Sequence, residues 1–202
     1  MTEISTKFFY YSNRAIEDVS EFSKEELNKE SKKIPSVQNL IEEMGEKGFR
    51  YVGAPESDSK AYTDIEKKQI FISKNATLNE AILSITYELI NAKNQDKFKK
   101  VFAEYLHDPY PTQKRAEEYS SKILKIEAEA VFLRSFVALS LGLVDSIKNP
   151  IYLDLVKGCE KPSQESINKI HDEMLVNGKV HKGTKRAFDH YVAQYYKFNK
   201  SR

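Results

Sequence analysis

The sequence predicts an α+β fold that is mostly helical, with a small antiparallel sheet packed on one amphipathic helix and on one long buried helix. Apolar residues recur at helical spacing along most of the 202 residues, and only two short runs have a strand-like pattern. Glycine and proline are few, at seven and six residues, as is usual for a helical globular chain. We therefore expect a single domain over residues 1–202, a length that can bury a sizeable core.

The first third of the chain contains both predicted strands. After an N-terminal lead-in over residues 1–33, Pro35 begins a helix in which apolar residues at positions 37, 40, 41 and 44 share one face. Residues 49–53 alternate like a strand, and a turn at 64–67 leads to a second strand over 69–73. We expect the Ile-Phe-Ile run of 69–73 to form the edge of the sheet.

A capping box marks the start of the next helix, because Thr77 is followed three residues later by Glu80. At 100° per residue, four apolar residues then fall within about 40° of one another and form the core stripe. They are Leu78, Ile82, Ile85 and Leu89. The opposite arc carries polar side chains, namely Ser84, Tyr87 and Asn91, with Glu88 at its margin.

Helices fill the rest of the predicted chain. A charged helix over 93–106 breaks at 107–111, and a long helix follows to about residue 143. The second half of that helix is apolar on nearly every face, which is typical of a central buried helix. We expect residues 34–145 to form the core of the domain and 146–202 a C-terminal helical part, which ends in a helix over 183–200.

Composition excludes several classes of function. The 32 Lys and Arg nearly cancel the 30 Asp and Glu, so we expect no nucleic-acid partner. One cysteine and four histidines rule out a disulfide framework, a Cys-based zinc finger and an iron–sulfur cluster. No run approaches the ~18 apolar residues of a spanning helix, so no membrane span is expected. The Lys- and Asn-rich composition and the lack of a signal-peptide pattern favour a bacterial protein that is cytoplasmic or secreted by a signal-peptide-independent route.

The helix that begins at Thr77 carries the motif Tyr87-Glu88-Leu89-Ile90-Asn91. It resembles the HExxH motif of bacterial zincin-like metallopeptidases, in which histidines at i and i+4 bind zinc and the glutamate polarises the metal-bound water. Here the glutamate is kept, but a phenol and an amide replace both histidines. Because these groups bind zinc poorly beside imidazole, we expect no metal and no other cofactor.

A second acidic position extends the resemblance. In gluzincin-type members a glutamate from a later helix supplies the third zinc ligand, and Glu127 lies in an acidic, Ala-rich stretch about 40 residues downstream. Helical spacing places Glu127 on the apolar arc, whereas Glu129 points to another side. A carboxylate there needs a partner, and Arg134, one heptad on, is the natural one. The predicted binding cleft comprises Ser84, Tyr87, Glu88, Asn91, Glu127 and Arg134.

The resemblance implies a catalytically inactive metallopeptidase homologue, a pseudopeptidase that binds a protein or peptide partner and that acts as a bacterial effector. Two alternatives stay open. The chain could be a hydrolase in which Glu88 and Glu127 act as acid and base, with a non-standard metal or none. It could also be a helical interaction or immunity-type protein that is unrelated to peptidases.

Overall fold

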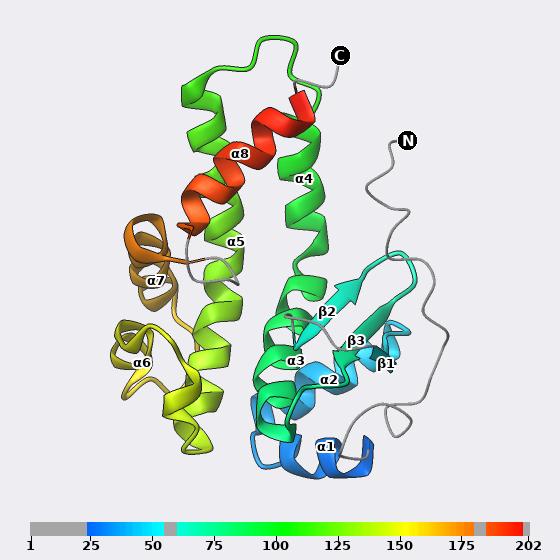
Figure 1. Ribbon diagram of the computed structural model, residues 1–202. Helices are drawn as coiled ribbons and strands as arrows, with labels where there is room; N and C mark the ends of the chain where they lie inside the picture. Colours follow the sequence, from blue (N-terminus) through cyan, green and yellow to red (C-terminus); the bar gives the residue numbers. More distant parts are fainter. Residues whose placement is uncertain (1–23, 55–59, 180–184, 200–202) are drawn as a thin grey trace. The chain divides into compact units, whose positions relative to one another are not determined.

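The computed structural model describes residues 24–54, 60–179 and 185–199, and the fold is α+β and mostly helical, as predicted (Figure 1). The chain divides into two compact units, one up to Leu89 and the other from Ile90 onward. The boundary falls inside helix α3 (Leu78–Lys93). The single domain over residues 1–202 stays a prediction. Residues 1–23 of the expected lead-in lie outside the described residues.

Two helices open the first unit, α1 (Lys24–Ser31) and α2 (Pro35–Glu46). Proline begins α2, and the predicted apolar face packs inward, with Val37, Leu40 and Met44 buried. Gly48 follows the helix at φ +87°, a conformation that glycine adopts without strain. The chain then turns into the first strand.

The sheet has three strands in the order β1-β3-β2, formed by β1 (Arg50–Ala54), β2 (Ala61–Asp64) and β3 (Gln69–Ser73). Strand β1 runs parallel to β3, and β2 runs antiparallel to β3. Two sequence expectations are therefore wrong. The sheet is mixed and not antiparallel, and residues 69–73 form its central strand and not an edge.

The cause of both errors is β2, which the sequence did not predict as a strand. A turn over residues 65–68 joins β2 to β3 as a hairpin, and the backbone N–H of Lys67 donates to Asp64 Oδ1 at 3.0 Å. Because β2 reverses the chain direction after β1, the returning β3 runs parallel to β1 and pairs with it. All five residues of β3 are buried, which suits a strand that is paired along both edges.

The predicted capping box begins α3. The backbone N–H of Thr77 donates to Glu80 Oε2 at 3.0 Å, and that of Glu80 donates to Thr77 Oγ1 at 3.3 Å. Of the expected core stripe, Ile82, Ile85 and Leu89 are at most 2% exposed, whereas Leu78, in the first turn, is half-buried.

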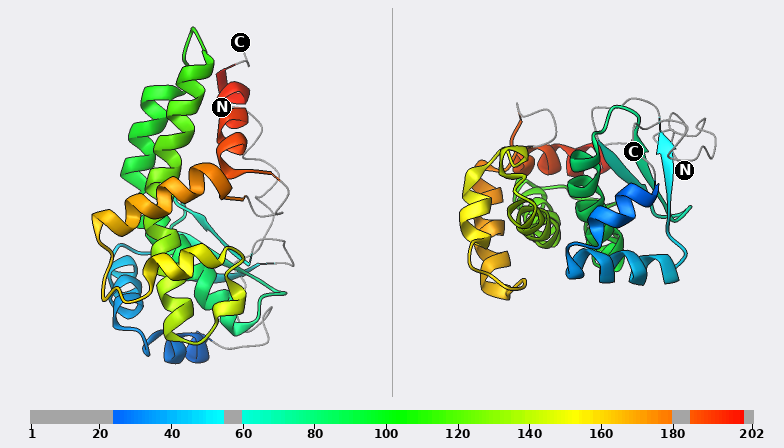
Figure 2. Two further views of the ribbon diagram at one scale, coloured as in Figure 1. Left: turned by 90° about the vertical axis from the view of Figure 1, so that its left-hand side faces the viewer. Right: turned by 90° about the horizontal axis from the view of Figure 1, so that it is seen from below.

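The second unit is built around α5, the long buried helix that the sequence predicted. Its helices are α4 (Gln95–Tyr105), α5 (Gln113–Ser140), α6 (Pro150–Val156), α7 (Gln164–Asn177) and α8 (Ala187–Asn199), with a 3₁₀ turn η2 (Val144–Ser146). Helices α4, α6, α7 and α8 all pack on α5, and Figure 2 shows α6 and α7 together on one of its sides. Among the helices of the described residues, none is both long and apolar enough to cross a membrane.

Candidate functional site

Four side chains interrupt the burial of α3. Between Ala81 and Ala92 the helix is buried on every face except for one strip of partly exposed residues. That strip consists of Ser84, Tyr87, Glu88 and Asn91, the polar arc predicted from helical spacing. A phenol, a carboxylate, an amide and a hydroxyl are thus presented side by side, and we call these four residues the α3 face.

Strand β2 contributes the residue that holds Glu88. Thr63 Oγ1 donates to Glu88 Oε2 at 3.0 Å, across 25 residues of sequence. Strand register pairs Thr63 with Ile70 and Ile70 with Tyr51, so these three side chains point to the same face of the sheet. From that face Thr63 contacts Glu88 of α3. Sequence reasoning missed Thr63 because it missed its strand, where the Tyr-Thr pair of strand-forming residues was the available signal.

Asn91 carries a buried polar atom at the end of the α3 face. Its Oδ1 has no hydrogen-bond partner among the described residues. A buried acceptor without a donor costs about 1–3 kcal/mol. Tyr87 and Asn91 occupy the i and i+4 positions of the motif. In the HExxH motif that it resembles, these two positions hold the zinc-binding histidines, whereas this helix has a phenol and an amide there.

Helix α5 carries the two remaining residues of the predicted cleft, Glu127 and Arg134, both half-buried. The Tyr191 hydroxyl of α8 donates to Glu127 Oε1 at 2.6 Å, a partner 64 residues away that the sequence did not indicate. Glu129 is held from a different element, because Asn94 Nδ2 donates to its Oε2 at 2.9 Å. Burial first, and the charge of Glu127 second, raise the pKa of Tyr119 on the same helix. The pairing of Glu127 with Arg134 stays a prediction.

Histidines and acidic groups do not assemble a metal site in the described part of the chain. His107, His171 and His190 all belong to the second unit, and His181 lies outside the described residues. Within the described ranges, no group of three or more His, Cys, Asp or Glu side chains is placed to hold a metal ion.

One arrangement in the second unit has the composition of a catalytic triad. His171 Nε2 lies 3.3 Å from Ser121 Oγ, and His171 Nδ1 lies 3.5 Å from Asp172 Oδ1. However, Nε2 also lies 3.1 Å from the Ser121 carbonyl oxygen, so this nitrogen carries the proton and donates it to that oxygen. A protonated Nε2 cannot accept the hydroxyl proton of Ser121, and the arrangement therefore does not activate a nucleophile.

We expect His171 to make the second unit less stable in mild acid. Burial is the main cause that lowers its pKa, and Lys125 adds to this, while the Ser121 carbonyl and Asp172 act in the opposite direction. The unfolded chain, with a histidine pKa near 6.5, therefore takes up the proton first as the pH falls. The stabilisation is complete above about pH 6.5 and is lost as the pH falls toward the lowered folded pKa.

Urea unfolding of the wild type and of His171→Gln between pH 7.5 and 5 measures this effect. The wild type is expected to lose stability more steeply than the variant over this range. His190, whose pKa burial also lowers, contributes in the same direction, so His190→Gln is the matched comparison. Parallel pH profiles for the wild type and His171→Gln would contradict the assignment.

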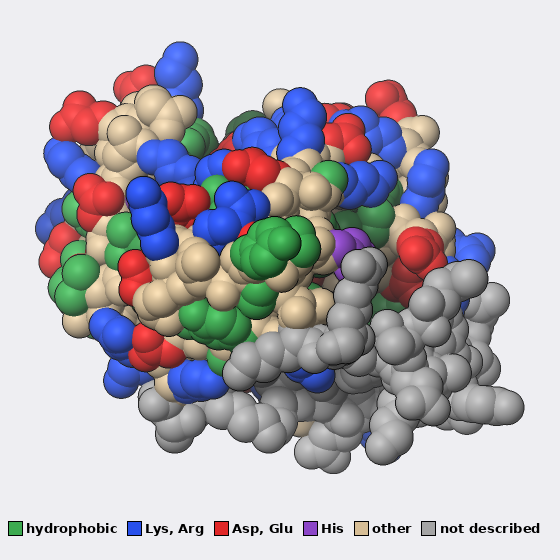
Figure 3. Space-filling model, turned by 90° about the horizontal axis from the view of Figure 1, so that it is seen from above, with side chains coloured by type: hydrophobic (Ala, Val, Ile, Leu, Met, Phe, Trp, Pro, Cys, Tyr) green, Lys and Arg blue, Asp and Glu red, His purple; other side chains and the backbone are tan. Residues whose placement is uncertain are grey.

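Charges of both signs are interspersed on the face drawn in Figure 3. This mixture agrees with the near cancellation of charge in the sequence, which has a net charge of +2.

Comparisons with protein-family models, with curated proteins and with solved structures find no match for this chain.

Proposed function

We propose that this chain is a catalytically inactive, peptidase-like domain that binds a protein or peptide partner through the α3 face. One observation carries the proposal: between Ala81 and Ala92 the helix is buried except for a single partly exposed strip of four polar side chains, and this strip contains the three polar residues of the degenerate motif. A surface helix of a globular domain exposes a broad polar face, whereas binding sites place a small number of polar groups in mostly apolar surroundings, as this strip does.

The chemistry of the α3 face favours binding over cleavage. Tyr87 and Asn91 stand where imidazoles would hold a metal, and neither group is a good zinc ligand. Glu88 would act as the base, but its carboxylate accepts a hydrogen bond from the hydroxyl of Thr63, which lies on the edge strand β2. This bond supports a structural or recognition role for Glu88 in place of proton abstraction from a metal-bound water.

The same side chains are well suited to recognise a polypeptide. Tyrosine is enriched at protein interfaces because its ring buries a large area and its hydroxyl keeps a hydrogen-bond partner. Asn91 is partly exposed, and its carboxamide carries the same kinds of hydrogen-bonding groups as a peptide backbone. The setting we propose for this binding is a bacterial one, with the chain acting as an effector that is cytoplasmic or secreted by a signal-peptide-independent route; the Lys- and Asn-rich composition favours the bacterial origin.

Panning a phage-displayed library of random peptides on the immobilised chain tests the proposal. Enriched peptides are expected to bind Tyr87→Ala at least about thirtyfold more weakly than the wild type, since truncating an aromatic anchor costs about 2 kcal/mol or more. Lys169→Ala, on the exposed surface of α7, is the matched control and should bind normally. Circular dichroism would establish that both variants fold. Enrichment no better than on the bare support, or equal affinity for Tyr87→Ala and the wild type, would contradict the proposal.

A further inference from the structure

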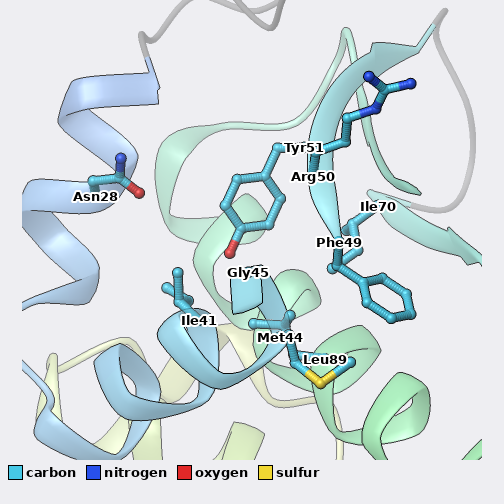
Figure 4. A pocket seen from close by; sticks show the side chains of 9 residues that line it. All are labelled: Asn28, Ile41, Met44, Gly45, Phe49, Arg50, Tyr51, Ile70 and Leu89. Carbon is cyan, nitrogen blue, oxygen red and sulfur yellow. The ribbon is translucent and has the colours of Figure 1, made fainter. Parts of the chain in front are cut away.

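A cavity of about 210 Å³ lies in the first unit, between the sheet and helices α1, α2 and α3 (Figure 4). Its lining is mostly apolar and consists of Asn28, Ile41, Met44, Gly45, Phe49, Arg50, Tyr51, Ile70 and Leu89. Met44, Phe49, Ile70 and Leu89 are buried, whereas Gly45 and Arg50 are exposed, so the cavity has a buried apolar floor and opens at one side.

Tyr51 brings a polar atom to this apolar lining. Its hydroxyl oxygen is buried and has no hydrogen-bond partner among the described residues. Figure 4 shows the phenol directed from β1 toward Gly45 and Ile41 of α2. Burial raises the pKa of Tyr51, so the phenol stays protonated at neutral pH and is available as a donor. Leaving such a donor unmatched costs about 1–3 kcal/mol.

Gly45 keeps space open beside this hydroxyl. A Cβ atom added at Gly45 would meet no other atom within 4 Å. Gly45 is the penultimate residue of α2 and lines the cavity, so a larger side chain at this position has room to extend along the lining.

We propose that this cavity binds a small, neutral and mostly apolar molecule that carries one hydrogen-bond acceptor, such as an aromatic ketone, and that Tyr51 donates to the acceptor. An apolar cavity of about 150 Å³ holds benzene, so the space suits a substituted benzene ring. Charge on the ligand is disfavoured, because Arg50 is the charged residue of the described lining and Figure 4 shows its guanidinium directed away from the cavity. This site is independent of the α3 face and of the function proposed for it.

A pair of nearly isosteric probes tests the site, acetophenone with a carbonyl oxygen and α-methylstyrene with a methylene group in its place. Both are titrated into the full chain, and the methyl signals of Met44, Ile70 and Leu89 are followed by ¹H–¹³C NMR. Saturable shifts are expected for both compounds. Acetophenone should bind about fivefold more tightly, the equivalent of about 1 kcal/mol for one hydrogen bond.

Three variants separate the hydrogen bond from the cavity. Tyr51→Phe is expected to retain binding and to lose the preference for acetophenone. Gly45→Leu should fill the cavity and abolish the saturable shifts, while Glu46→Leu, an exposed position on the same helix, should leave them unchanged. The proposal is overturned by a lack of saturable shifts in the wild type, by equal affinities for the two probes, or by a preference that persists in Tyr51→Phe.

Discussion

Replacing Tyr87 and Asn91 together by histidine is expected to turn α3 into a zinc-binding helix. The two positions are one helical turn apart on the α3 face, so two imidazoles there could bind one ion. Isothermal titration should give a Kd of about 1 μM or tighter for the double variant, about 8 kcal/mol of binding free energy, and no saturable binding for the wild type.

A histidine pair elsewhere on the chain serves as the control. Glu165 and Lys169 of α7 are also exposed at i and i+4, so histidines there provide two ligands on a surface with no peptidase resemblance. We expect the α3 pair to bind at least about tenfold more tightly, equivalent to about 1.4 kcal/mol, because the packing around α3 holds two imidazoles more rigidly than the exposed surface of α7 does. Equal affinities at α3 and α7 would contradict a site built for zinc.

Tyr119→Ala is expected to produce the largest loss of stability in the second unit. Tyr119 is fully buried on α5, and its ring centroid lies 6.0 Å from that of Tyr105 and 5.9 Å from that of Tyr195. Truncating an aromatic side chain in such a cluster costs about 3–5 kcal/mol, from lost burial and from the cavity that remains. Urea unfolding followed by near-ultraviolet circular dichroism measures the loss.

Tyr119→Phe separates the hydroxyl from the ring. The hydroxyl donates to Gln194 Oε1 at 2.9 Å, and losing this one bond should cost only about 1 kcal/mol. If Tyr119→Ala cost no more than Tyr119→Phe, the ring would not be part of the core, and the packing described for α4, α5 and α8 would be wrong.

The helical part of the candidate site could be predicted because helix geometry is local. The arc holding Ser84, Tyr87, Glu88 and Asn91 follows from 100° per residue, and it coincides with the partly exposed strip of α3. The capping box likewise needs residues only three apart, Thr77 and Glu80.

The sheet could not be predicted to the same depth. Strand β2 has four residues without an apolar run, and its pairing depends on where β3 returns, which is set by contacts distant in sequence. Missing β2 led to the wrong edge strand, the wrong strand direction and the omission of Thr63. The Tyr191 partner of Glu127 was missed for a similar reason, because no periodicity links residues of α5 and α8.

Native mass spectrometry of the chain with a peptide recovered by panning distinguishes peptide binding from peptidase activity, because one spectrum reports both binding and cleavage. After prolonged incubation we expect a one-to-one complex whose mass equals that of the chain plus the intact peptide, and we expect no such complex for Tyr87→Ala. Shortened peptide products that appear with the wild type and are absent with Glu88→Gln would contradict the proposal that the domain is catalytically inactive.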